Sequence, residues 1–342
     1  TYDIVCRLDG GRQIGVQCAV ELQAKARQSE ETKYIEDAFG GAQVLKSEHK
    51  CMVAKSRATG DCGMREEVEL NNRVPAAERV ISNDPSVVIK EVQCSDDTIF
   101  VAGDVVVYTI LYTKDEYEPC VQTMNVFPFS QALKAEFARP DMMGIATGDV
   151  KECYVRVQEN AMGEKRILQY ELVLSLSAEA YMEQRHQMVE DAYSTDEKLD
   201  CIREERRFVN KIEQSSCTSV VRSELSLPEG KSEMAKICAV SVKPIVIDTE
   251  KVQGQIRVAG ILELNVVYIS ADDGKINAFS SEQPFEVFDN DELLDGELEA
   301  CVCVESIAFT MQSSTEMEAK LTLKVNITAK QICTCNVVTS ME

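Results

Sequence analysis

The amino-acid sequence predicts an all-β protein, built of tandem β-sandwich-like modules that are joined by short helical linkers. The first observation is that apolar residues alternate with polar ones over many segments, which is the period of a half-buried strand. The second is that hydrophobic residues make up 44% of the 342 residues, enough to bury cores. Because Trp is absent and aromatic residues make up only 6%, we expect these cores to consist of Val, Ile and Leu.

The first element of the repeat is a short acidic segment. The sequence YIEDAFG at 34–40 recurs as MVEDAYS at 188–194. The segments in front of it, QCAVELQAKA at 17–26 and YELVLSLSAEA at 170–180, both alternate apolar and polar residues. This alternation predicts a strand that leads into each copy of the acidic segment.

Two pairs of segments predict β-hairpins. Residues 2–12 and 154–166 each contain two strand-like stretches around a polar turn with glycine. Residues 99–116 and 256–274 share Val-Ala-Gly, then alternating Val, Ile and Leu, then Tyr and an acidic turn. Each member of the second pair is followed by a Pro-Phe dipeptide, so we expect the same unit to occur at least twice.

A third copy of the later strands lies near the end of the chain. The sequence LEACVCVESIAF at 298–309 resembles VKECYVRVQENA at 150–161, and KLTLKVNITAK at 320–330 resembles ELVLSLSAEAY at 171–181. The last two segments start 149 residues apart, since 320 − 171 = 149. The repeat therefore indicates three modules rather than two.

These matches predict the domain organisation. We expect a partial first module with its linker at 1–85, a complete second module with its linker at 86–235, and a third module that lacks the rear linker at 236–342. Mixed charge with apolar residues at roughly helical spacing predicts helical linkers around 27–38 and 182–206.

The repeated motifs resemble one family. The stretches GDVVVYTILY and GILELNVVY, the Pro-Phe turns and the EDAF and EDAY segments are similar to the SPOCS domain of SipL-type spore-coat morphogenetic proteins. The resemblance implies a non-catalytic β-rich assembly module of the spore coat or spore surface. It also implies synthesis in the mother cell, an extracellular place when mature, and other spore-coat proteins as partners.

Charge and hydropathy exclude several classes of protein. The net charge of −22, from 36 Lys and Arg against 58 Asp and Glu, argues against nucleic-acid binding, which needs clustered Lys and Arg. No apolar run approaches the ~18 residues of a membrane-spanning helix. The excess of acidic residues indicates either a soluble surface whose copies repel one another, or an acidic face that binds a basic partner or Ca²⁺.

Catalytic and cofactor motifs are absent from the sequence. It contains no phosphate-binding loop, no GxSxG motif and no CxxC pair, and we expect neither an enzyme nor a bound cofactor. His49 lies two residues before Cys51 on a predicted strand, and we interpret the two as a surface or packing pair rather than a catalytic dyad. The Asp-rich loops at 270–275 and 288–297 fit turn chemistry, with a weak Ca²⁺ site as the alternative.

The fourteen cysteines carry the most information about chemistry. The CVC and CTC sequences, Cys301 with Cys303 and Cys333 with Cys335, each lie in a predicted strand. Residues i and i+2 share one face of a strand, about 6.5–7 Å apart, which favours bonds to a neighbouring strand over a bond within the pair. Three interpretations remain open: buried apolar thiols, disulfides within or between subunits, and a thiolate metal site.

We expect the two CxC pairs to face each other if their strands are antiparallel neighbours. The incomplete ends of the chain further suggest that one copy completes another, as in strand-addition fibres. The candidate cross-linking residues are Cys6, Cys18, Cys301, Cys303, Cys333 and Cys335.

The sequence thus predicts a structural protein of the spore coat or spore surface that self-associates, as a homo-oligomer or a filament, through cysteine cross-links. One alternative is a non-covalent adaptor that recruits coat proteins through an acidic surface. The other is a thiolate metal-binding protein.

Overall fold

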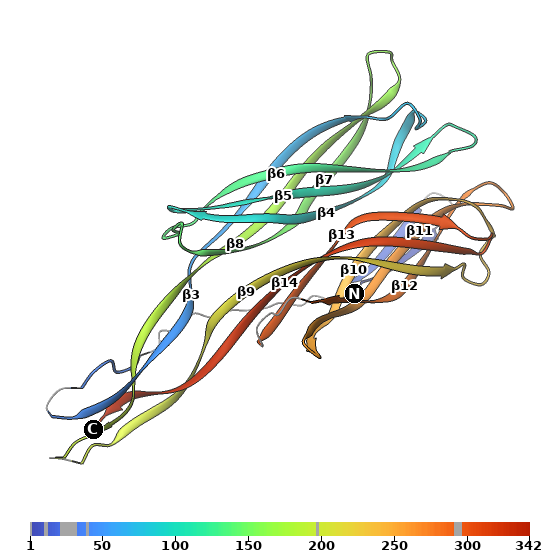
Figure 1. Ribbon diagram of the computed structural model, residues 1–342. Coiled ribbons are helices and arrows are strands. Elements are labelled where there is room, and N and C mark those ends of the chain that lie inside the picture. The colour runs from blue at the N-terminus through green and yellow to red at the C-terminus, as the bar shows by residue number, and fades with distance from the viewer. Residues whose placement is uncertain (1, 10–12, 21–32, 39–40, 196–197, 291–295) are drawn as a thin grey trace.

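The chain is an all-β protein, as predicted. The computed structural model describes residues 2–9, 13–20, 33–38, 41–195, 198–290 and 296–342. Over these ranges it forms fourteen strands, all paired antiparallel, and no helix (Figure 1).

Six strands form the first sandwich, in two three-stranded sheets. One sheet has the order β3 (Gln43–Glu69), β8 (Lys165–Tyr193) and β7 (Met143–Glu159). The other has the order β4 (Ala77–Ser95), β5 (Thr98–Thr113) and β6 (Cys120–Lys134). One continuous apolar core fills the space between these sheets.

The second sandwich repeats this topology strand for strand. Its sheets have the orders β13 (Glu297–Met311), β14 (Glu316–Met341) and β9 (Cys201–Ser226), and β10 (Met234–Val252), β11 (Gln255–Ser270) and β12 (Ile276–Asp289). Separately, β1 (Tyr2–Asp9) and β2 (Gln13–Val20) pair as a hairpin; the predicted hairpin at 2–12 covers only its first strand, and residues 10–12 lie outside the described residues. By the repeat, this hairpin corresponds to the β7–β8 pair.

Alternation along the strands explains the cores. On β8, every second residue from Leu168 to Ala180 is buried in the first core. Over the second half of β5, buried and exposed residues do not alternate. Val105 and Val107 face the first core, and Val106 and Tyr108 on the opposite face contact the second sandwich. β5 is therefore buried on both faces, which explains its nearly continuous apolar sequence.

The repeated glycine and Pro-Phe motifs form a cross-strand pair in each sandwich. Gly103 on β5 lies opposite Phe129 on β6, and Gly260 on β11 lies opposite Phe285 on β12. A Cβ at Gly103 would lie 2.2 Å from the backbone oxygen of Val88 and 3.1 Å from the Phe129 ring. The glycine admits the neighbouring backbone, and the aromatic ring covers the gap that a missing side chain leaves.

The longest strands extend beyond the sandwiches. The β3–β8 ribbon and the β9–β14 ribbon leave their sandwiches and meet at one end of the molecule, near the C-terminus (Figure 1). Two small apolar clusters join them there, one around Met188, Cys335 and Val337 and one around Val189 and Val338. We call this region the tip, and define it as residues 33–54, 181–214 and 328–342, so far as these are described.

The sheets cross the predicted module boundaries. β3, from the predicted module 1–85, pairs along its length with β8, and β9, from the predicted module 86–235, pairs with β14. The packing unit is thus a six-stranded sandwich, whereas the three-module division describes the sequence repeat and stays a prediction.

The prediction of helical linkers is wrong where the structure describes them. Residues 182–193 continue β8, residues 201–206 begin β9, and residues 33–38 form no helix. Residues 27–32 and 196–197 lie outside the described residues. The reason is visible at Glu183, Arg185 and Gln187, which are all exposed and two residues apart, so the exposed polar positions follow the strand period.

Candidate functional site

The acidic repeat segments mark a place where distant parts of the chain meet. Ile35 corresponds to Val189 when the two acidic segments are aligned, and Val189 corresponds to Val338 at the 149-residue offset. The backbone N–H of Val189 donates to the carbonyl of Ile35 at 3.0 Å, and the N–H of Ile35 donates to the carbonyl of Val338 at 3.0 Å. The exits of all three repeats therefore join in the tip.

Three cysteines lie close to one another in the tip. Cys51 on β3 and Cys335 on β14 are buried, and Cys333 is half-buried. Burial raises the pKa of the Cys51 thiol to about 11, and the neighbouring thiols of Cys335 and Cys333 add to the rise. Burial also raises the pKa of Cys335, so the thiols of Cys51 and Cys335 are protonated at neutral pH and suit packing better than reaction.

The two histidines make structural contacts. His49 Nε2 lies 2.6 Å from Ser47 Oγ, and its ring packs edge-on against Phe208. His186 Nδ1 lies 2.6 Å from the hydroxyl of Tyr34. Both histidines thus help to hold the tip together.

The first CxC pair lies at the rim of the interface between the sandwiches. Cys301 is exposed on β13, and Cys303 is buried against Val88, Val106 and Tyr108 of the first sandwich. The Cys303 thiol lies 3.5 Å from the carbonyl oxygen of Val87. A hydrogen bond from the Cys303 thiol lowers the pKa of Cys301 to about 7, whereas the pKa of Cys303 is raised. The exposed member of the pair is the one with thiolate character.

The expectation that the two CxC pairs face each other is wrong. β13 and β14 are antiparallel neighbours, but Cys301 lies opposite Asn326 and Cys303 opposite Lys324. Cys333 and Cys335 lie beyond the end of β13, opposite Phe208 and Arg206 of β9. The long extension of β14 into the tip separates the pairs, and nothing in the CxC spacing signals that extension.

The remaining predicted cysteines lie on the N-terminal hairpin. The backbone register sets Cys6 opposite Val16 and Cys18 opposite Ile4. The Cys18 side chain is exposed, and the side chain of Cys6 lies outside the described residues.

The structure also brings together a pair that the sequence did not single out. Cys120 at the start of β6 and Cys238 on β10 pack in one apolar cluster between the sandwiches. They are 118 residues apart, since 238 − 120 = 118, and neither belongs to a CxC or CxxC motif. Only the packing of one sandwich on the other identifies them.

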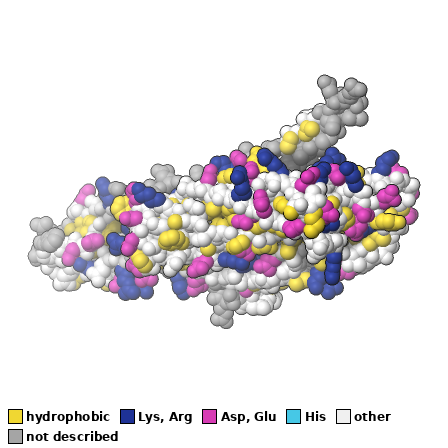
Figure 2. Space-filling model, turned by 90° about the horizontal axis from the view of Figure 1, so that it is seen from above, with side chains coloured by type: hydrophobic (Ala, Val, Ile, Leu, Met, Phe, Trp, Pro, Cys, Tyr) yellow, Lys and Arg dark blue, Asp and Glu magenta, His cyan; other side chains and the backbone are white. Residues whose placement is uncertain are grey.

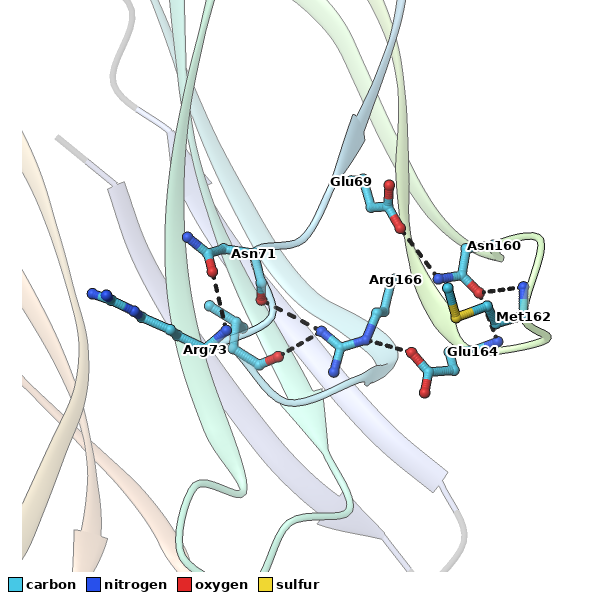
Figure 3. A network of polar contacts seen from close by, with 8 residues as sticks. Glu69, Asn71, Arg73, Asn160, Met162, Glu164 and Arg166 are labelled. Carbon is cyan, nitrogen blue, oxygen red and sulfur yellow. Dashed lines mark hydrogen bonds and ion pairs between the residues drawn. The ribbon is translucent and has the colours of Figure 1, made fainter.

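A polar network clamps the opposite end of the first sandwich (Figure 3). Asn160 Nδ2 donates to Glu69 Oε1 at 3.2 Å, which ties the β7–β8 turn to the end of β3. Arg166 donates to Glu164 Oε2 at 2.8 Å and to the carbonyl of Val74 at 2.9 Å. The network joins the turn, β3 and the loop that leads to β4, which is a structural role.

The charge is dispersed over the visible surface. Figure 2 shows Lys and Arg side chains among Asp and Glu side chains over the whole face in view, with hydrophobic side chains between them. Several ion pairs of the described residues join neighbouring strands, such as Arg65 with Glu171 at 3.0 Å and Lys330 with Glu299 at 3.2 Å. The net charge of −22 is therefore not gathered into one acidic patch on this face.

The described residues form neither a metal cluster nor a membrane-spanning helix. Among the described residues, no group of three or more His, Cys, Asp or Glu side chains is arranged to hold a metal ion. Within the same residues, no helix has the length and apolarity to cross a membrane.

The fold and its contacts define a tandem β-sandwich protein. A family model described as "SipL, SPOCS domain" matches residues 76–158 and 233–311. These segments run from the start of β4 to the end of β7, and from just before β10 to the end of β13. These two segments are thus similar to the SPOCS domain, which confirms the resemblance and relates the chain to spore-coat proteins. No curated protein and no solved structure matches the chain.

Proposed function

We propose that this chain is a non-catalytic structural protein of the spore coat or spore surface, and that it self-associates through cysteine cross-links. The family match supports the relation to spore-coat proteins. The exposed thiol of Cys301 carries the cross-linking part of the proposal, because it is accessible on β13 and the hydrogen bond from Cys303 lowers its pKa, which favours the reactive thiolate.

The position of Cys301 supports this role. β13 is an edge strand of its sheet, since the order is β13, β14, β9. An edge strand offers unpaired backbone groups to a strand of another chain. A second copy that adds to this edge would bring its own thiols close to Cys301. Cys18 and Cys333 are two further thiols that are not fully buried.

The test is the mobility of the native protein on a denaturing gel, after alkylation of free thiols, with and without reduction. We expect multimers that collapse on reduction to one band at about the chain mass of 38.1 kDa. Cys301→Ala is expected to remove most of the multimers. Cys62→Ala, which changes a thiol buried in the first core, is the control and should leave them unchanged.

The alternative outcome is equally clear. A single monomer band in both lanes would reject covalent self-association and favour the non-covalent adaptor. Partner binding by such an adaptor would weaken with salt, because exposed charges are screened, whereas disulfides are not affected.

A further inference from the structure

Three polar contacts, between two pairs of residues, join the segment around the start of β6 to the start of β10. Lys236 Nζ lies 2.8 Å from Glu118 Oε1. Four residues further along the strands, Gln122 Nε2 donates to the carbonyl of Val240 at 2.9 Å, and the N–H of Val240 donates to Gln122 Oε1 at 3.2 Å. The two segments therefore run side by side in the same direction, one from each sandwich.

Cys120 and Cys238 lie midway between these two pairs of residues. They share a closed apolar cluster with Ile110 and Ala239, and they are 2% and 5% exposed. A hydrogen bond with the Cys238 thiol lowers the pKa of Cys120, and the same bond together with burial raises the pKa of Cys238. The two cysteines thus pack next to each other in one cluster across the interface.

A β-bulge turns Cys238 towards the first sandwich. The register between β10 and β11 shifts between Ile237 and Ala239, so Cys238 has no partner on β11. Ile237 and Val240 point into the core of the second sandwich, while Cys238 and Ala239 both contact the first. Bulges commonly re-aim a side chain in this way.

A fixed turn holds Cys120 in place on the other side. The carboxylate of Asp115 accepts hydrogen bonds from the N–H groups of Tyr117 at 2.8 Å and Glu118 at 2.9 Å. The N–H of Thr113 donates to the carbonyl of Pro119 at 3.0 Å. The residues directly before Cys120 are therefore ordered, and Glu118 is held where it meets Lys236.

We propose that Cys120 and Cys238 form a disulfide that fastens the two sandwiches to each other. The oxidant is a small-molecule disulfide such as oxidised glutathione. One cysteine thiolate attacks a sulfur of the oxidant and releases one small thiol; the second thiolate then attacks the mixed disulfide and releases the other. The protein loses two protons and two electrons, and the oxidant gains them as two thiols.

Burial determines how the bond forms. An oxidant reaches neither thiol in the closed interface. The reaction therefore takes place while the two sandwiches are briefly separated, or during folding before they pack together. Cys62 and Cys94 have their pKa raised by burial alone and lie inside one sandwich. These cysteines are expected to stay reduced under the same conditions.

The test is to refold the purified full chain at low concentration in a glutathione redox buffer, alkylate it, and digest the monomer with trypsin. Cys120 and Cys238 are the sole cysteines of the fragments 115–134 and 237–251, because trypsin does not cut between Lys243 and Pro244. We expect mass spectrometry to find these fragments linked, and to separate on reduction. Recovery of both fragments fully alkylated would overturn the proposal.

Thermal unfolding gives an independent readout. The bond closes a loop of 118 residues, and we expect it to raise the midpoint by at least about 5 °C, reversibly on reduction. Cys120→Ala and Cys238→Ala should abolish the rise, and Cys94→Ala, the matched buried control, should keep it. The same rise in all variants would contradict the proposal. Working on the monomer keeps this test separate from cross-linking between copies.

Discussion

Gly103 shows how one repeated residue determines local structure. A Cβ there would lie 2.2 Å from the backbone oxygen of Val88, a distance that a carbon atom does not reach without a shift of β4 against β5. We expect Gly103→Ala to lower the free energy of unfolding by about 2 kcal/mol or more, because the strain falls on backbone rather than on a flexible side chain. Denaturant unfolding measures this directly.

Gly63→Ala is the matched control. Gly63 lies on β3, and a Cβ there would meet no atom within 4 Å. We expect this change to alter the free energy of unfolding by less than about 0.5 kcal/mol, since alanine loses less backbone entropy than glycine on folding. If both changes alter the free energy of unfolding equally, β4 can move away from a Cβ at position 103, and the prediction is wrong.

The tip is an element whose stability is testable on its own. Val189 is fully buried in the cluster that joins β8 to β14, and its N–H bonds to Ile35. We expect Val189→Ala to weaken the tip by about 2 kcal/mol, because it leaves a cavity among apolar side chains. Amide hydrogen exchange at Ile35 and Val189 should then quicken about 25-fold.

The sandwich cores should not respond to this change. Amides of β5 and β11 are expected to keep their exchange rates, and Val220→Ala, at a valine that is 53% exposed on β9, should leave the tip unchanged. A loss of protection throughout the molecule would instead indicate that the tip and the sandwiches unfold as one unit.

The elements that the sequence predicted correctly are those with local signals. The hairpin after Gly103 and the one after Gly260 follow from alternation, a turn and a Pro-Phe motif within about 35 residues. The prediction of a helical linker at 182–206 is wrong, because the mixed charge fits a helix as well as a strand, while the exposed residues at 183–187 follow the strand period. The strand partners of residues 182–206 lie on β3 and β14, more than a hundred residues away in the chain, so local pattern did not show that they pair.

The same contrast applies to the candidate cysteines: a pair on one strand is predictable from the sequence, and a pair that two sandwiches bring together is not. The shared face of Cys301 and Cys303 follows from the strand period and agrees with the structure. The meeting of Cys120 with Cys238 needs the docking of two sandwiches and a bulge at Cys238, and no spacing rule encodes either.

At the scale of the whole molecule, buried thiols predict how stability depends on pH. The thiols of Cys51 and Cys153 have a pKa of about 11 in the folded chain, against an ordinary value of 9.0, chiefly because they are buried. Between these values the unfolded chain has lost the protons that the folded chain still holds, so stability falls as pH rises from about 9 to 11. The thermal midpoint should fall across this window.

The variant that replaces both Cys51 and Cys153 by alanine gives the comparison. Its midpoint should fall less steeply than that of the parent chain between pH 9 and 11, although its midpoint at pH 7 is lower because two packed side chains are shortened. Parallel curves for the two proteins would show that other groups control the alkaline loss of stability.

The joined exits of the repeats have a consequence for the order of folding during synthesis. Ile35 is made early, yet one of its two backbone partners, Val338, is made 303 residues later. Each sandwich can close as soon as its own strands have left the ribosome, since domains generally fold as units in the order of synthesis. The tip has to wait for the last strand. The tip therefore closes only after translation has passed residue 338. A chain that stops short of this point leaves strand edges in the tip unpaired, and these edges can pair with other chains.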